Sequence, residues 1–386
     1  MLPNADIWRD LPCFSNLGKH LIQGQRFVII EAEEEASQTF DNYLSLPLFT
    51  FNLIELTMNK LYTLACFLLA ALFVACGPGK DRIRFEGTLS NINDAEFYVY
   101  SEDGAFEGID TVKITDGKFV YERKMSSPAV LTLLYPNFTQ TYIVVEPGST
   151  IKMKGDASKI GEAQITGTEQ NELLSDFRIK HTSDAASNQR LAAAQFIREN
   201  AQTLAAVAVF RKYFANKETP DAQTALQLLD VLKKAQPKEK AVAFLEKFYR
   251  PIFLNGAGEP LPVFTAQTID GATVSSNSYK GKKLVIACVG TWQSDSRPLL
   301  INLRRKLRTL GGEWQCLVVS LDVDHAVLRS SLKNDSINYP VICDRQAFNS
   351  PLVQTLGLHY VPSLMLINEH GKIIQRDVTK VEDAKF

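Results

Sequence analysis

The stretch KLVIACVGTWQSDSRPLLINLRRKLRTLGG, from Lys283 to Gly312, decides the fold of the C-terminal part of this chain. Its first seven residues are almost wholly apolar, which is typical of a strand buried on both faces of a sheet. A short polar turn then leads into a helix that ends at Gly311 and Gly312. The helix has one apolar face, made by Leu299, Leu303, Leu307 and Leu310. The stretch therefore predicts a strand, a turn and a helix that packs on a sheet.

The same alternation of strands and helices continues on both sides of this unit. Asp270-Gly271 predicts a hairpin before it. The apolar segments CLVVSLD, YPVICD and VPSLMLIN predict further strands after it, with helices between them. Such an arrangement is typical of a largely parallel sheet covered on both faces. We therefore predict one α/β domain over residues 258–386.

Two regions with different periodicities precede this domain. Residues 168–250 space their apolar residues three and four apart, which predicts a spacer of three or four amphipathic helices. Residues 82–167 contain seven short segments that alternate apolar with polar residues, separated by turn dipeptides such as Asp116-Gly117. This second pattern predicts a small antiparallel β domain, either a sandwich or an open barrel. The fold class is thus multi-domain: a β domain, a helical spacer and an α/β domain.

The β domain shows no pattern of catalytic residues. We find in it no paired carboxylates, catalytic histidine or glycine-rich loop. Phe97, Tyr98 and Tyr100 could together form a glycan-binding face. Their spacing along a strand instead favours a division of these side chains between the core and the strand surface.

A targeting segment is predicted near the N-terminus. From Met58 the chain reads MNKLYTLACFLLAALFVACGPG, with one positive charge and then an apolar run that is too short to span a bilayer comfortably. We predict a signal peptide over 58–75 that ends in a lipobox, with lipid attached to Cys76. An uncleaved anchor and a buried helix are the alternatives. Because a signal sequence acts at a chain's start, residues 1–57 are predicted to be a mis-called N-terminal extension.

Charge and residue counts exclude several classes of protein. The chain of 386 residues has 42 Lys and Arg against 43 Asp and Glu, so it lacks the basic surplus of a nucleic-acid-binding protein. Its five histidines have no ligand spacing, and its six cysteines form no C-x-x-C pair. We therefore expect no nucleic acid, no metal and no cofactor.

The C-terminal domain resembles the thioredoxin fold, within its membrane-anchored thiol-disulfide oxidoreductase and AhpC/TSA peroxiredoxin-like branch. The resemblance rests on LPVFTAQTIDG, KGKKLVIACVGTW, VPSLMLIN and Gly371. The whole arrangement, from lipobox through β domain and helical spacer, also resembles envelope lipoproteins common in Bacteroidota. In these, the β domain has no established activity.

The residues that perform the chemistry of that family are missing. Its members carry W-C-x-x-C where this chain reads Trp292-Gln293-Ser294-Asp295-Ser296, so Gln293 and Ser296 replace the attacking and resolving cysteines. A helix N-terminus stabilises the thiolate there, but neither an amide nor a hydroxyl can exchange a disulfide. Ala287, Leu299 and Ile301 depart from the family pattern as well. The catalytic site is thus predicted to be degenerate, with Ser294 or Asp295 as the N-cap of the helix.

Three other cysteines follow Cys76 in the chain. Cys288 lies inside an apolar strand, Cys316 begins the next strand and Cys343 ends another. Buried, inert thiols are the first interpretation, because burial raises a thiol's pKa and blocks access to it. A Cys288–Cys316 bridge, or a peroxidatic role for one of the three, is the alternative.

Two classes of function follow from these observations. The first is a redox-inactive, lipid-anchored envelope protein that faces the periplasm or the cell exterior and holds a protein or peptide partner. The second is a thiol-disulfide oxidoreductase or peroxidase that uses a cysteine outside the motif. In the family, Val361-Pro362 matches a loop with a cis proline, beside which substrates pair as an added strand. Trp292, Gln293, Val361 and Pro362 are therefore the candidate peptide groove, unless Pro362 only maintains the loop.

Overall fold

The computed structural model describes residues 79–215 and 221–386. The predicted signal peptide at 58–75, the proposed lipid site Cys76 and the extension at 1–57 lie outside the described residues. Within those two ranges, no helix is long and apolar enough to cross a membrane.

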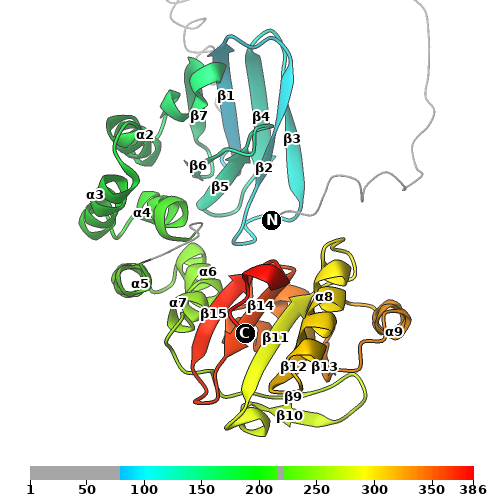
Figure 1. Cartoon of the computed structure of the whole chain (residues 1–386). Coiled ribbons are helices and arrows are strands. Elements are labelled where there is room, and N and C mark those ends of the chain that lie inside the picture. The colour runs from blue at the N-terminus through cyan, green and yellow to red at the C-terminus, as the bar shows by residue number, and fades with distance from the viewer. Residues whose placement is uncertain (1–78, 216–220) are drawn as a thin grey trace, which may run out of the picture. The chain divides into compact units, whose positions relative to one another are not determined.

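Two four-stranded sheets form the β domain (Figure 1). Their strand orders are β4-β1-β7-β8 and β3-β2-β5-β6. The strands are β1 (Arg82–Ser90), β2 (Ala95–Tyr100), β3 (Ile109–Ile114), β4 (Lys118–Lys124), β5 (Ala129–Leu134), β6 (Gln140–Val145), β7 (Thr150–Asp156) and β8 (Gln164–Thr166). β8 was not predicted, since three residues are too few to show a period. The predicted all-antiparallel pairing is wrong for β1 and β7, which pair in parallel, because local alternation does not encode strand direction.

The core of the β domain lies between the two sheets, so the domain is a sandwich. Phe85 of β1 and Phe119 of β4 pack edge-on, with ring centroids 4.9 Å apart, and Phe97 of β2 reaches them from the other sheet. Gly87 makes room for this cluster, because a Cβ there would lie 2.4 Å from the ring of Phe119. Phe97 is buried whereas Tyr98 is exposed, so the three aromatic residues of β2 do not share a face.

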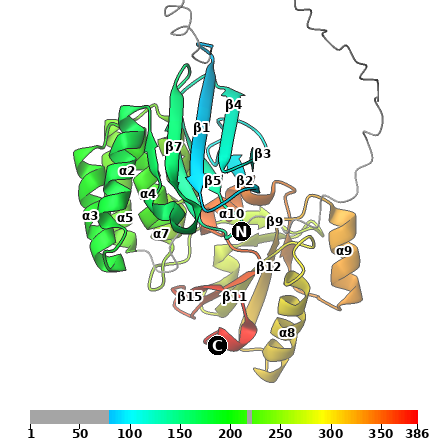
Figure 2. The same cartoon turned by 90° about the horizontal axis from the view of Figure 1, so that it is seen from above.

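The spacer forms six α-helices within the described residues, where three or four were predicted. They are α2 (Glu169–His181), α3 (Ala186–Glu199), α4 (Leu204–Phe210), α5 (Ala222–Ala235), α6 (Lys240–Phe248) and α7 (Arg250–Leu254), and a π-helical turn η3 (Arg211–Ala215) continues α4. α4 is a separate helix from α3, and the hydroxyl of Thr203 caps it by accepting from the N–H of Ala206. α2, α3, α4 and α5 lie together in Figure 2. They bury Val130, Tyr142 and Val144 on the second face of β5 and β6.

A five-stranded sheet of order β13-β12-β11-β14-β15 is the centre of the C-terminal domain. Its strands are β11 (Lys283–Val289), β12 (Trp314–Ser320), β13 (Val341–Ile342), β14 (Ser363–Ile367) and β15 (Ile373–Val378), and the predicted hairpin is β9 (Thr265–Gln267) with β10 (Thr273–Ser275). β11, β12 and β13 are parallel, whereas β14 and β15 run antiparallel. The sheet is thus mixed and not largely parallel. A tight turn through Gly371 joins β14 to β15, and only antiparallel strands can be connected so.

Helices and apolar side chains cover both faces of this sheet, as predicted. The helices are α8 (Ser296–Thr309), α9 (His325–Asn334) and α10 (Pro351–Leu356), with short 3-10 turns η4 (Ser276–Tyr279), η5 (Ala347–Asn349) and η6 (Val381–Asp383) here and η2 (Ala157–Glu162) in the β domain. Leu299, Leu303 and Leu307 of α8 pack on one face of the sheet, while α10 packs on the other. α8 begins at Ser296. Asp295 is its N-cap residue, but its side chain makes no capping hydrogen bond.

Candidate functional site

The segment between β11 and α8 forms two consecutive tight turns. The N–H of Gln293 donates to the carbonyl of Gly290 at 3.0 Å, and the N–H of Ser296 donates to the carbonyl of Gln293 at 3.0 Å. Gly290 leaves room for the indole of Trp292, because a Cβ there would lie 2.6 Å from its Nε1. Trp292 remains 44% exposed, so the turn presents an aromatic ring to solvent.

A buried carboxylate holds this turn in place. Asp322, which follows β12, is 4% exposed. It accepts from the N–H of Thr291 at 2.9 Å, from the hydroxyl of Thr291 at 2.5 Å and from the hydroxyl of Ser320 at 2.7 Å. These hydrogen bonds fix both the backbone and the side chain of Thr291, so Asp322 is a positioning residue for the turn. This role was not identified in the sequence analysis. Its sign in the sequence is that the apolar segment CLVVSLD ends in polar residues, Ser320 and Asp322.

Gln293 and Ser296 occupy the positions predicted for the two cysteines. Ser296 begins α8 and is 4% exposed, and its Oγ accepts from the N–H of Gly290 at 3.1 Å. Gln293 is half-buried, and its Oε1 accepts from the hydroxyl of Ser294 at 3.3 Å. Both side chains thus hold the turn by neutral hydrogen bonds, and neither carries an atom that can attack a disulfide.

The loop before β14 lies at the same end of the sheet as this turn. Ser363 begins β14 and is the register partner of Cys288, one residue before the end of β11. Pro362 directly precedes Ser363, and the turn follows directly after Val289. The loop and the turn therefore adjoin neighbouring strands, β14 and β11, at the same end of the sheet. The Val361–Pro362 peptide bond is cis, as the resemblance implied. Val361 is half-buried and Pro362 is buried, which leaves Trp292 as the most exposed of the four candidate groove residues.

Comparison with known proteins agrees with this geometry. Residues 257–376 match the AhpC/TSA family, and residues 83–174 match a domain of unknown function, DUF4369. The C-terminal domain is a thioredoxin-like domain of the AhpC/TSA family. It is close to the thiol-disulfide oxidoreductases. The family that matches the β domain is described only as one of unknown function.

Individual relatives named here match about a third of this chain. The chain is 25% identical over 123 residues to the thiol-disulfide oxidoreductase ResA of Bacillus thuringiensis subsp. konkukian, and equally to that of Bacillus cereus. Each match covers 31% of this chain and 67% of the relative. Among solved structures, a thiol-disulfide oxidoreductase of Bacteroides fragilis is 20% identical, with a TM-score of 0.29, covering 31% of this chain and 90% of that one. The thioredoxin domain of a Bacteroides vulgatus thiol-disulfide oxidoreductase is 18% identical, with a TM-score of 0.30, over 32% and 89%.

The cysteines of the thioredoxin-like domain are all buried free thiols. Cys288 faces one side of the sheet, with Leu284 and Ile286, while Cys316 faces the other, with Val285. The alternative of a Cys288–Cys316 bridge is therefore wrong, because Cβ atoms on opposite faces of a sheet cannot be joined.

Burial also changes the acidity of two of these thiols. It raises the pKa of the Cys288 thiol to about 12, with a smaller contribution from the Asp377 carboxylate. It also raises the pKa of Cys316. The thiolate is the nucleophile in exchange and peroxidase chemistry, so a raised thiol pKa lowers the fraction that could attack at neutral pH.

The histidines of the domain are held by separate partners. Nε2 of His325 lies 2.9 Å from the carbonyl of Cys343, and Nδ1 of His359 lies 3.1 Å from the carbonyl of Gly357. Burial lowers the pKa of His359. In the part of the chain that the structure describes, no three His, Cys, Asp or Glu side chains are grouped as a metal site would require.

Proposed function

We propose that the protein is a lipid-anchored envelope protein whose thioredoxin-like domain does not exchange disulfides and instead holds a protein or peptide partner. The observation that carries the proposal is the chemistry of the turn before α8, where Gln293 and Ser296 stand at the two redox positions. The segments around them are held in place, since Asp322 accepts hydrogen bonds from Thr291 of the turn and Pro362 is buried directly before β14. A domain that keeps its recognition loops without its thiols is suited to holding a partner.

The groove at this end of the sheet is the proposed binding surface. Trp292 supplies exposed aromatic area, and aromatic residues are enriched among the anchors of protein interfaces. The backbone of Val361 precedes β14 and is the segment that would pair with an extended chain. Such pairing needs no cysteine at 293 or 296.

The competing proposal is an enzyme that uses a cysteine outside the motif. It would need one of Cys288, Cys316 and Cys343 to be reactive, and all three are buried. Labelling the folded protein with iodoacetamide near neutral pH separates the two. We expect none of the three thiols to react within the time in which they all react after denaturation. A thiol that labels in the native state, together with insulin reduction that its alanine variant abolishes, would establish the enzyme instead.

Crosslinking tests the holding function itself. A photoreactive residue introduced at Gln293, in the turn before α8, is compared with one at Arg305, which is exposed on α8 itself. We expect a discrete partner to be captured from position 293 alone. Equal capture from both positions, or none from either, would end the proposal for this groove.

Attachment to the membrane is tested at Cys76. Metabolic labelling with a fatty-acid analogue is expected to mark the wild-type chain and not Cys76→Ala. Equal labelling of the two chains would contradict the predicted lipobox, and recovery of the chain from the cytoplasm would contradict the signal peptide as well.

A further inference from the structure

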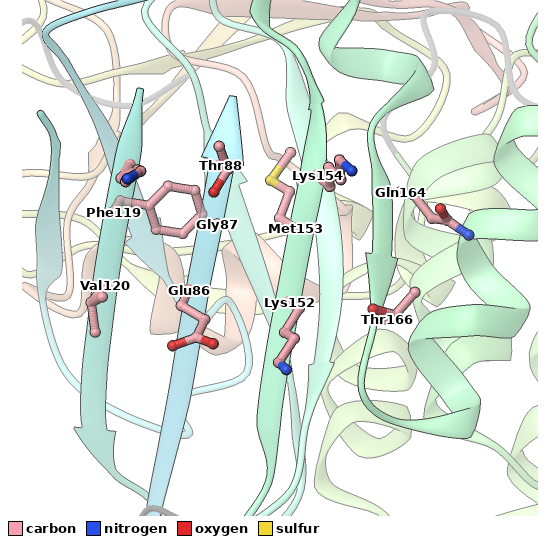
Figure 3. Close-up of a pocket in the computed structure, with 11 residues that line it drawn as sticks. Glu86, Gly87, Thr88, Phe119, Val120, Lys152, Met153, Lys154, Gln164 and Thr166 are labelled. Atoms are coloured by element: carbon pink, nitrogen blue, oxygen red, sulfur yellow. The ribbon is translucent and has the colours of Figure 1, made fainter. Parts of the chain in front are cut away.

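The outer face of the sheet β4-β1-β7-β8 contains a broad, shallow cavity (Figure 3). Its volume of about 660 Å³ lies within the range of small-molecule sites, roughly 300–1,000 Å³. All four strands contribute to its lining. The polar side chains on which recognition would depend are Thr88, Lys118, Lys152, Lys154, Gln164 and Thr166. This cavity lies in the β domain and belongs neither to the thioredoxin-like turn nor to its groove.

Strand register places the lysines of this cavity in a regular array. Lys118 is paired with Thr88, and Thr88 with Lys154, so the two lysines lie two strands apart in one row. Adjacent strands are about 4.8 Å apart, which puts the Cα atoms of Lys118 and Lys154 about 10 Å from each other. Lys152 lies on the same face as Lys154, two residues along β7 and about 7 Å away. The face thus carries three lysines whose Cα atoms are about 7 and 10 Å apart.

The lysines of this face form no ion pair with Glu86, the one carboxylate in the lining of the cavity. Glu86 is the register partner of Lys152, but its carboxylate accepts from Nε of Arg84 at 2.7 Å. Among the described residues, none of the three lysines has a carboxylate within 4 Å. Their ammonium groups are exposed and available to an anionic ligand.

The backbone of the face excludes one common mode of recognition. β1 is paired on both sides, with β4 and β7, and β7 is paired with β1 and β8. Main-chain groups of the two central strands are therefore engaged in the sheet, so an extended peptide cannot be added there as a strand. The ligand must be recognised by side chains, through charge from the lysines and hydrogen bonds from threonine and glutamine.

We propose that this lysine face, defined by Lys118, Lys152 and Lys154 with Thr88, Gln164 and Thr166, binds an acidic oligosaccharide. Carboxylate groups repeated along a sugar chain would pair with the lysines. The sugar hydroxyls both donate and accept hydrogen bonds, and the threonine hydroxyls and the amide of Gln164 match them. This binding is independent of the thioredoxin-like groove.

Binding of short oligomers of galacturonic acid to the full-length chain in neutral detergent tests the proposal. The variant Lys118→Gln/Lys152→Gln/Lys154→Gln is compared with Lys180→Gln/Lys234→Gln/Lys238→Gln, which removes the same charge from exposed lysines of the spacer. We expect the first variant to bind at least about tenfold more weakly than wild type and the second to bind normally. The methyl-esterified oligomer, which lacks the charge, should bind as weakly as the first variant binds the acid.

Three results would overturn the proposal. The first is an absence of binding by the wild-type chain, and the second is equal loss in both triple variants. The third is a preference for another polyanion. In that case polyglutamate, or vesicles containing phosphatidylglycerol, would bind to the same lysines more tightly than the oligosaccharide does. Each of these leaves the proposed function of the thioredoxin-like domain untouched.

Discussion

The turn before α8 and the lysine face differ in how their polar groups are satisfied. In the turn, the buried Asp322 has three donors, and Ser296 and Gln293 both accept hydrogen bonds from neighbouring residues. On the lysine face, three cations of the β domain have no carboxylate partner. A satisfied polar group contributes to the fold, whereas exposed and unpaired charges contribute little and remain free for a ligand. Asp322 and Ser296 of the turn are thus expected to matter for stability, and the three lysines for binding alone.

The largest expected effect is that of Asp322→Ala. It removes the acceptor of Thr291 and Ser320, and leaving such donors unsatisfied costs about 2–3 kcal/mol of unfolding free energy. Two of the three tryptophans, Trp292 and Trp314, lie in the thioredoxin-like domain, so their fluorescence follows its unfolding in urea.

Asp383→Ala is the control for this variant, because its exposed side chain makes no hydrogen bond and the change should stay within about 0.5 kcal/mol. Chymotrypsin should also cleave after the exposed Trp292 faster in Asp322→Ala, since the turn opens. Equal stability of the two variants would remove Asp322 from its positioning role.

The sequence predicts the turn well and the lysine face poorly, for physical reasons. The apolar run of β11 and the leucines of α8 produce periods that are read directly, and Gln293 and Ser296 are identified by comparison with a family motif. Asp322 was not found because its partner Thr291 is 31 residues away along the chain and no local pattern records the bond. Lys118 and Lys154 come together only through β1, whose parallel pairing with β7 the alternation does not encode.

A second prediction concerns pH and the buried thiols. Burial raises the pKa of Cys288 to about 12, and that of Cys316 is also raised, whereas an unfolded thiol ionises near 8.5. The stability that each thiol contributes is complete below that unfolded pKa. It is lost as the pH rises, because the unfolded state alone releases the proton. Between about pH 9 and 10, the unfolding free energy should fall by up to about 1.4 kcal/mol per thiol.

Alanine variants identify the source of that slope. In Cys288→Ala, the unfolding free energy should fall less steeply with pH, because one of the two titrating thiols is gone. Val285→Ala, a buried truncation in the same strand, should lower the unfolding free energy at every pH and leave its pH dependence unchanged. Urea titrations followed by tryptophan fluorescence at several pH values measure both. A slope that survives the replacement of Cys288 and Cys316 together would show that other groups cause it.

A third prediction tests whether the turn still accepts the family's chemistry. Gln293→Cys with Ser296→Cys should fold and cost about 1 kcal/mol, since the hydrogen bond accepted by Ser296 is the main loss. In the folded double variant, the half-buried thiol at 293 should react with iodoacetamide, while Cys288, Cys316 and Cys343 remain unlabelled. Peptide mass spectrometry assigns each label. A double variant that does not fold would show that the turn has become specific for its present residues.

The smallest expected effect is that of Lys118→Gln/Lys152→Gln/Lys154→Gln on stability, although this variant should abolish most ligand binding. The three side chains are exposed and unpaired, so their replacement removes no favourable contact and relieves some mutual repulsion. The change in unfolding free energy should therefore stay within about 0.5 kcal/mol and should shrink further at high salt, where charges are screened. Hydrogen exchange of the amides of β1 and β7, with and without salt, measures it within the β domain. A loss above 1 kcal/mol would mean that the lysines hold the sheet together, and the comparison between a structural site and a binding site would then fail.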